Sequence, residues 1–132
     1  MREILFRGKN AVGEWAYGYY RKGILDGNPI SLIIAGGDII NTTMSAIQVC
    51  APETIGQYTG LKDKNCGKIF EGDIVKYGNR LHKVVYETRN ECAYFGIVIS
   101  ELDTWGFTYS VPCKKMEVVG NIYDNPELLG DD

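Results

Sequence analysis

The chain has 132 residues, 45% of them hydrophobic and 23% charged, a composition that excludes intrinsic disorder. The formal net charge is −3, and the last twelve residues contain four acids and no base, so the rest of the chain is close to neutral. This balance argues against a protein that binds nucleic acid through bulk positive charge. The length suffices for one compact domain or for two small β units.

The four cysteines lie far apart in the sequence: Cys50, Cys66, Cys92 and Cys113. A zinc site usually takes Cys and His ligands at short spacing, and His82 is the only histidine. We therefore expect free thiols in a reducing compartment, with no metal and no cofactor. Residues 1–7 lack the apolar segment of a secretory signal. The longest apolar run, residues 30–35, is too short to cross a membrane, so no membrane partner is expected.

The N-terminal part reads as strands and turns. Trp15, Tyr17 and Tyr19 alternate along one segment, which places three aromatic rings on one face of a strand. The sequence Asp26-Gly27-Asn28-Pro29 predicts a turn. The expected strands are residues 4–6, 14–20 and 30–34, with a return strand at residues 39–40. Residues 45–49 are expected to form either a strand or a single helical turn. Pro52 indicates a connection, and the N-terminal β region is predicted to end at residue 55.

Five further strands are predicted in the C-terminal part: residues 73–77, 81–86, 94–100, 106–111 and 117–123. Gly78-Asn79 predicts a two-residue hairpin turn after the first of them, and residues 112–116 a tight turn before the last. Pro126 is expected at the first position of a single helical turn near the C-terminus. No segment sustains the period of a long helix. The fold class is therefore all-β, with a small SH3-like barrel over residues 56–132 and the region 1–55 packed on it.

Four segments, in order, resemble the YopX family of phage and prophage proteins. They are Met1-Arg2-Glu3-Ile4 through Lys9, Gly13-Glu14-Trp15 through Tyr19, Pro52-Glu53-Thr54-Ile55-Gly56-Gln57-Tyr58-Thr59-Gly60-Leu61-Lys62-Asp63-Lys64-Asn65 with Lys68 to Val75, and Glu117 to Leu129. Together these segments span both ends and the middle of the chain. No motif is found in residues 24–50 and 89–112.

The resemblance implies a mostly β protein in the cytoplasm of a host bacterium, and it transfers no catalytic residue. The chain departs from the family pattern at one position. The family commonly has Asn-Gly in the central turn, whereas here Cys66 follows Asn65 and the glycine is Gly67. A turn that needs positive φ is then expected to shift by one residue or to use Asn65.

Three chemical interpretations of single motifs are weaker than structural ones. Residues 60–72 offer glycines and lysines, but Gly67-Lys68 lacks the following Ser or Thr and the helix of a phosphate-binding loop. Glu71 and Asp73 form a possible carboxylate pair, yet a glycine between two acids also suits a bend before a strand, with Asp73 binding a backbone N–H. His82 falls on the polar phase of its strand and has no evident catalytic partner. The segment from Lys62 to Asn65 reads as a solvated turn.

Basic and aromatic residues give the best candidate for a binding surface. Residues 57–89 hold seven Lys or Arg side chains against four acids. The candidate residues are Lys62, Lys64, Lys68, Lys76, Arg80, Lys83, Tyr58, Tyr77 and Tyr86, with the tyrosines as stacking platforms. We expect a non-enzymatic accessory protein that binds a host or phage protein. A nucleic-acid-binding module that uses this surface is the alternative, an enzyme is the third interpretation, and a homo-oligomer stays open.

Overall fold

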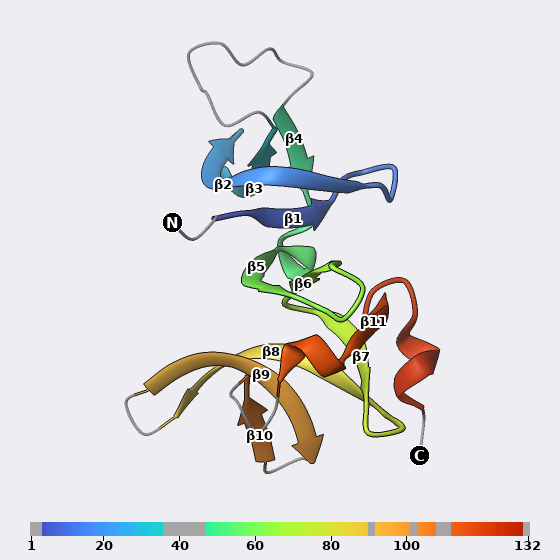
Figure 1. Cartoon of the computed structure of the whole chain (residues 1–132). Coiled ribbons are helices and arrows are strands. Elements are labelled where there is room, and N and C mark those ends of the chain that lie inside the picture. Colours follow the sequence, from blue (N-terminus) through green and yellow to red (C-terminus); the bar gives the residue numbers. More distant parts are fainter. Residues whose placement is uncertain (1–3, 36–46, 90–91, 101–102, 108–111, 131–132) are drawn as a thin grey trace. The chain divides into compact units, whose positions relative to one another are not determined.

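Strands and tight turns follow one another along the chain in the computed structural model, which describes residues 4–35, 47–89, 92–100, 103–107 and 112–130 (Figure 1). No α-helix occurs among these residues, and the three short helices are 3-10 turns. The prediction of an all-β protein is therefore confirmed.

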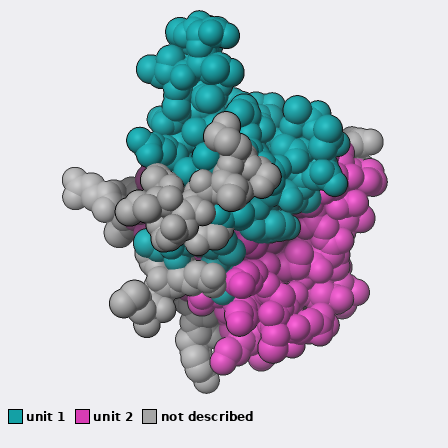
Figure 2. Space-filling model, turned by 90° about the horizontal axis from the view of Figure 1, so that it is seen from above, with its two compact units in different colours: residues 1–58 teal, residues 59–132 magenta. Residues whose placement is uncertain are grey.

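The chain divides into two compact units, Met1–Tyr58 and Thr59–Asp132, which are coloured separately in Figure 2.

The first unit is an antiparallel sheet with the strand order β4-β3-β2-β1-β5. Its strands are β1 (Phe6–Lys9), β2 (Trp15–Leu25), β3 (Asn28–Ile34), β4 (Ile47–Cys50) and the start of β5 (Gly56–Lys62). The 3-10 helix η2 (Pro52–Thr54) connects the last two. Ala16, Ile33 and Cys50 form the buried core, and Phe6, Tyr20 and Ile55 pack against it.

The second unit continues β5 and pairs it with β6 (Lys68–Phe70). Its main sheet has the order β10-β9-β8-β7-β11, and every neighbouring pair is antiparallel. The strands are β7 (Asp73–Tyr77), β8 (Arg80–Arg89), β9 (Cys92–Ser100), β10 (Asp103–Gly106) and β11 (Glu117–Asn121). Two 3-10 helices, η3 (Cys113–Lys115) and η4 (Pro126–Leu129), lie on either side of β11 in the sequence.

The core of the second unit is formed by five fully buried side chains: Ile69, Val75, Val84, Ile97 and Met116. Val75 and Val84 come from the neighbouring strands β7 and β8, and Ile97 lies opposite Val84 on β9. Met116 comes from the segment between η3 and β11. The prediction of an SH3-like barrel is not confirmed, because β10 and β11 end an open five-stranded sheet and the described residues form no closed barrel.

The hairpin turns follow from local residue preference. Gly78 and Asn79 have φ values of 61° and 67°, and Asp26 and Gly27 have values of 52° and 79°. Two successive positive φ angles give the turn whose twist matches that of the flanking strands, and Gly, Asn and Asp tolerate them best. Both predicted turns are therefore confirmed. Pro126 starts η4 as predicted.

Several predicted boundaries differ from the structure. The first strand is Phe6–Lys9 rather than 4–6, since these four residues pair with Trp15–Gly18 on β2. Residues 47–50 form a strand, which decides the open choice between strand and helical turn for residues 47–49. Residues 45 and 46 lie outside the described residues. The strand expected at 106–111 is wrong in its start, because β10 ends at Gly106. Its residues 108–111, like the return strand at 39–40, lie outside the described residues.

His82 was assigned to the wrong face of its strand. It pairs with Val75 across β7 and β8, and paired residues point to the same side of a sheet. Val75 lies in the core, so His82 is buried too, and its Nδ1 atom lies 3.0 Å from the carbonyl oxygen of Val98. His82 is therefore a hydrogen-bonded core residue. The alternation of residue types along β8 did not reveal that His82 faces the core. Its neighbours Leu81 and Lys83 are both half-buried, so the strand has no clearly exposed face at this point.

Candidate functional site

The nine residues predicted to form a binding surface do not lie on one face. Tyr58 belongs to the first unit and is buried, whereas the other eight belong to the second. Lys83 pairs with Ile74, which puts Lys83 and Lys76 on one face of the main sheet. Arg80 pairs with Tyr77 and points with it to the opposite face. Whether these residues bind a partner stays a prediction, but they do not form the single surface that was proposed.

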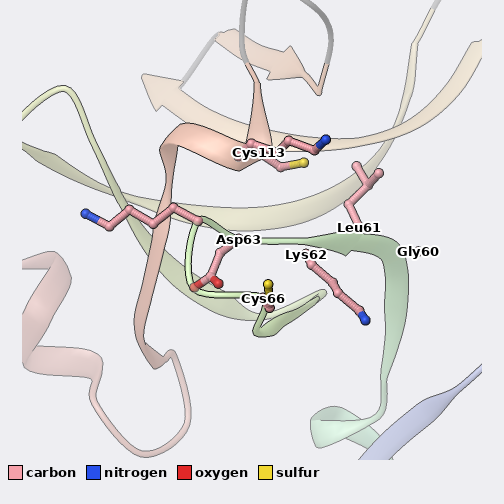
Figure 3. A pocket seen from close by; sticks show the side chains of 8 residues that line it. Gly60, Leu61, Lys62, Asp63, Cys66 and Cys113 are labelled. Atoms are coloured by element: carbon pink, nitrogen blue, oxygen red, sulfur yellow. The ribbon is translucent and has the colours of Figure 1, made fainter.

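Two of the nine, Lys62 and Lys64, line a pocket in the second unit (Figure 3). The pocket has a volume of about 460 Å³ and a mostly apolar wall. Its lining residues come from two segments, the end of β5 with the turn that follows it, and helix η3: Gly60, Leu61, Lys62, Asp63, Lys64, Cys66, Cys113 and Lys114. A smaller hollow of about 240 Å³ adjoins it and shares Leu61, Cys113 and Lys114.

A tight turn from Asp63 to Gly67 forms one side of the pocket. The Asp63 backbone N–H donates to the Gly67 carbonyl at 2.8 Å, and the Cys66 N–H donates to the Asp63 carbonyl at 3.0 Å. The backbone N–H of Lys64 donates to the Met116 carbonyl at 2.9 Å. The turn is therefore fixed both internally and to the segment that leads into β11.

The Asp63 carboxylate holds this turn together. Its Oδ1 atom accepts hydrogen bonds from the N–H groups of Asn65 and Gly67, at 2.9 and 2.8 Å. Its Oδ2 atom accepts a bond from the N–H of Val118, at 2.9 Å and 55 residues further along the chain. The residue is only 7% exposed. The expectation that Asp63 binds its own turn is confirmed, but the interpretation of this segment as fully solvated is wrong for Asp63.

These contacts also set the charge of Asp63. Burial by itself would raise the pKa of the carboxyl group. The hydrogen bonds from Val118, Gly67 and Asn65, together with the nearby Lys64 ammonium, outweigh burial, so the pKa is lowered from its ordinary value. Asp63 is therefore an anion at neutral pH whose charge is already directed at backbone N–H groups. We infer that its role is structural.

Cys66 takes the left-handed conformation in this turn, with φ of 64°. The expectation that the conformation would move to Asn65 or Gly67 is wrong, because neither of them has a positive φ. The hydrogen bonds of Asp63 to the residues on both sides of Cys66 fix the turn, so the thiol-bearing residue adopts the conformation at some cost in energy. The Cys66 side chain is exposed and points into the pocket (Figure 3).

Replacing Cys66 with glycine should therefore stabilise the protein. The left-handed conformation costs a residue with a Cβ atom about 1 kcal/mol more than glycine. We expect the free energy of unfolding to be higher for Cys66→Gly than for Cys66→Ala by this amount, measured by urea denaturation. Cys66→Ala is the control, since it removes the thiol but keeps the Cβ atom. Equal stabilities for the two variants would contradict a strained turn.

The pocket combines positive charge with apolar surface. Lys62, Lys64 and Lys114 are exposed, and Leu61 and the two cysteines supply apolar wall. Lys64 Nζ lies 3.6 Å from the Glu117 carboxylate, but both side chains are about half exposed, so this ion pair is weak. Figure 3 shows Cys66 and Cys113 on opposite sides of the pocket, with Lys62 extending outward. The arrangement suits a ligand that has an acidic group beside apolar atoms.

The acidic motif after β6 has a structural role. Asp73 is 2% exposed, and its carboxylate accepts a hydrogen bond from the Phe70 N–H at 2.7 Å. Gly72 has φ of 93°, which allows the bend before β7. The structural interpretation of Glu71-Gly72-Asp73 is thus supported. Among the described residues no group of three or more His, Cys, Asp and Glu side chains is placed to hold a metal ion.

Sequence reasoning missed Leu61, Cys113 and Lys114 as pocket residues. Cys113 and Lys114 belong to η3, some fifty residues after the turn, and only the packing of η3 against the core brings them to Cys66. The available sequence evidence was the pair Lys114-Lys115, which follows Pro112-Cys113 in a segment assigned only as a turn. No helix in the described part of the chain is long and apolar enough to span a bilayer.

Comparison with known proteins agrees with the resemblance found in the sequence. A family model described as YopX protein matches residues 17–130. Among solved structures, the crystal structure of protein EF1440 from Enterococcus faecalis is similar, with a TM-score of 0.51 and 25% sequence identity over 98% of this chain and 99% of that one. A comparison with curated protein sequences found no match.

Proposed function

This chain belongs to the YopX protein family, and from that premise we propose that it is a non-enzymatic accessory protein that binds another protein. The pocket beside the Asp63–Gly67 turn is the proposed contact site. Its ligand is a segment of the partner that carries an acidic side chain next to an apolar one. The phage or prophage origin, the host cytoplasm as location and homo-oligomer formation stay predictions that rest on the resemblance and on the sequence.

One observation carries this proposal: three lysines surround a mostly apolar pocket in which the single carboxylate, Asp63, is bound to backbone N–H groups. The net charge available to a ligand is therefore positive. Apolar wall and positive rim together match the usual division of a protein-binding site into a hydrophobic centre and a polar edge. The alternative, nucleic-acid binding through the predicted lysines and tyrosines of residues 58–86, gains no support, because those residues point to different faces.

Reversing the charge of the pocket should abolish partner binding. We expect the triple variant Lys62→Glu, Lys64→Glu, Lys114→Glu to lose a protein that the wild type captures from host or phage-infected lysate. For the purified partner, the dissociation constant should rise at least about tenfold, since three exposed charges at roughly 0.5 kcal/mol each amount to that factor. Isothermal calorimetry measures the change.

The matched control is Lys68→Glu, Lys76→Glu, Lys83→Glu, which makes the same change in net charge outside the pocket. This variant should capture the partner as the wild type does. If both triple variants lose the partner equally, binding depends on net charge and the pocket is not the site. If neither variant loses it, the protein-binding pocket is refuted.

A further inference from the structure

The first unit presents a row of aromatic side chains that is separate from the pocket. Along β2, Ala16 and Gly18 are buried on one side of the sheet, whereas Tyr17 and Tyr19 are 47% and 52% exposed on the other. The two tyrosines are two residues apart on one strand, so their side chains leave the sheet about 7 Å from each other. This face was predicted from the alternation of Trp15, Tyr17 and Tyr19, and its exposure is shown by the structure.

Cationic side chains lie beside these rings. On β1, Lys9 pairs with Trp15 and Arg7 pairs with Tyr17, so both point to the aromatic face. The Arg7 guanidinium lies 4.5 Å and the Lys9 ammonium 5.4 Å from the centre of the Trp15 ring. Arg7 is buried and fixes Trp15, whereas Lys9 is only half-buried and retains contact with solvent. Arg21 is exposed and lies two residues beyond Tyr19 on the same face.

The charge of the strands in this unit is entirely positive. Strands β1 to β4 contain Arg7, Lys9, Arg21 and Lys22 and no aspartate or glutamate. The acids among the described residues of the unit lie outside the strands, at Glu14, Asp26 and Glu53. The unit is thus locally basic along its sheet, although the whole chain has a net charge of −3. An anionic chain that runs along β2 would meet Lys9 near one end of the tyrosine pair and Arg21 near the other.

We propose that the face of β2 that carries Tyr17 and Tyr19, with Lys9 of β1 beside it, binds single-stranded nucleic acid. Tyr17 and Tyr19 stack on two successive bases, and Lys9 and Arg21 contact the flanking phosphates. Unpaired bases offer ring faces that tyrosines can stack on, whereas a duplex keeps those faces covered by neighbouring bases. The absence of acids from the strands favours a phosphate chain over a protein partner, because protein surfaces carry both signs of charge. This surface is distinct from the lysine-lined pocket.

Fluorescence anisotropy with labelled 12-nucleotide strands tests the proposal. The probes are oligodeoxythymidine, oligouridine and a duplex of mixed sequence. We expect the full-length protein to bind at least one of the single strands more tightly than the duplex. Affinity should fall about tenfold between 50 and 200 mM salt, as expected for two or three phosphate contacts. The two single strands distinguish DNA from RNA as the preferred ligand.

Substitutions then locate the site. Tyr17→Ala and Tyr19→Ala should each raise the dissociation constant about tenfold, and Arg21→Gln should weaken binding and reduce its salt dependence. Tyr17→Phe with Tyr19→Phe keeps both rings and should bind like the wild type. Tyr86→Ala is the matched control, since Tyr86 is 49% exposed in the second unit and should not affect binding. Thermal unfolding checks that each variant is folded.

Three results would overturn the proposal. One is no change in anisotropy at 50 mM salt with protein up to 100 µM. Another is equal or tighter binding of the duplex. The third is unchanged affinity for the tyrosine-to-alanine variants. Should the tyrosines instead prove necessary for capturing a protein while no strand binds, the face is a protein-binding surface and the nucleic-acid assignment is wrong.

Discussion

Asp63→Ala should lower the free energy of unfolding by on the order of 3 kcal/mol, because it leaves three backbone N–H groups without their acceptor. Two of these groups fix the turn from Asp63 to Gly67, and the third, on Val118, fixes the turn to β11. A loss of this size should lower the midpoint of thermal unfolding by on the order of 10 °C. Differential scanning calorimetry and urea denaturation measure both quantities.

The variant Asp63→Asn separates the contributions of the two oxygens. Its amide oxygen can still accept the bonds of Asn65 and Gly67, but its NH2 group would face the N–H of Val118, and two donors repel each other. We therefore expect the free energy of unfolding of Asp63→Asn to lie between those of the wild type and Asp63→Ala. A stability of Asp63→Ala within 1 kcal/mol of the wild type would show that the carboxylate does not hold the turn.

The pH dependence gives an independent check on Asp63. Its pKa is lowered in the folded protein, so as the pH falls the unfolded chain takes up the proton first, near the ordinary pKa of an aspartate. The charge of Asp63 makes its full contribution to the free energy of unfolding at neutral pH. This contribution is lost as the pH falls through the lowered pKa. The difference in stability between the wild type and Asp63→Ala should therefore shrink below about pH 5. A constant difference would contradict the proposed role of the charge.

Gly18→Ala should destabilise the protein by about 3 kcal/mol, because a Cβ atom at this position would overlap the backbone of β3. The Cβ would contact the carbonyl oxygen of Ile34 and lie 2.7 Å from its carbonyl carbon and 3.0 Å from the nitrogen of Ala35. A backbone atom can move only if the strand moves, so the register of β2 and β3 is strained. Urea denaturation measures the loss.

Gly23→Ala is the matched control on the same strand. There a Cβ would lie 3.3 Å from the end of the Leu32 side chain and 3.4 Å from Cγ1 of Ile30, and flexible side chains can adjust. We expect a change within about 0.5 kcal/mol, since an alanine also restricts the unfolded chain. If both variants lose the same stability, the cost comes from replacing glycine in a strand and not from the contact with Ile34.

The local features of the fold were predictable because they depend on a few neighbouring residues. Gly78-Asn79 and Asp26-Gly27 adopt positive φ angles as their residue types favour. The alternation in β2 predicted an aromatic face, and Tyr17 and Tyr19 are exposed on it. The four segments of the YopX resemblance are likewise patterns of neighbouring residues, and the family is confirmed by the match over residues 17–130.

The candidate site was predicted only in part. Lys62 and Lys64 line the pocket, whereas Lys76, Arg80 and Lys83 lie on the main sheet. Lys76 and Lys83 point to one face of that sheet and Arg80 to the other. The two faces are assigned by register, and register depends on which side of each strand packs into the core. The half-buried residues of β8 do not alternate clearly enough for the sequence to show this.

The sequence by itself determined the family, the all-β class and the principal turns. Preferences for φ angles and alternating burial depend only on residues that are adjacent in the sequence. Only the tertiary structure decided that Asp63 holds Val118, that His82 is buried and that Cys66 and Cys113 share a pocket. Each of these facts joins segments distant in the chain. Their meeting depends on the packing of whole strands around Ile69, Val75 and Met116, and no single segment contains that information.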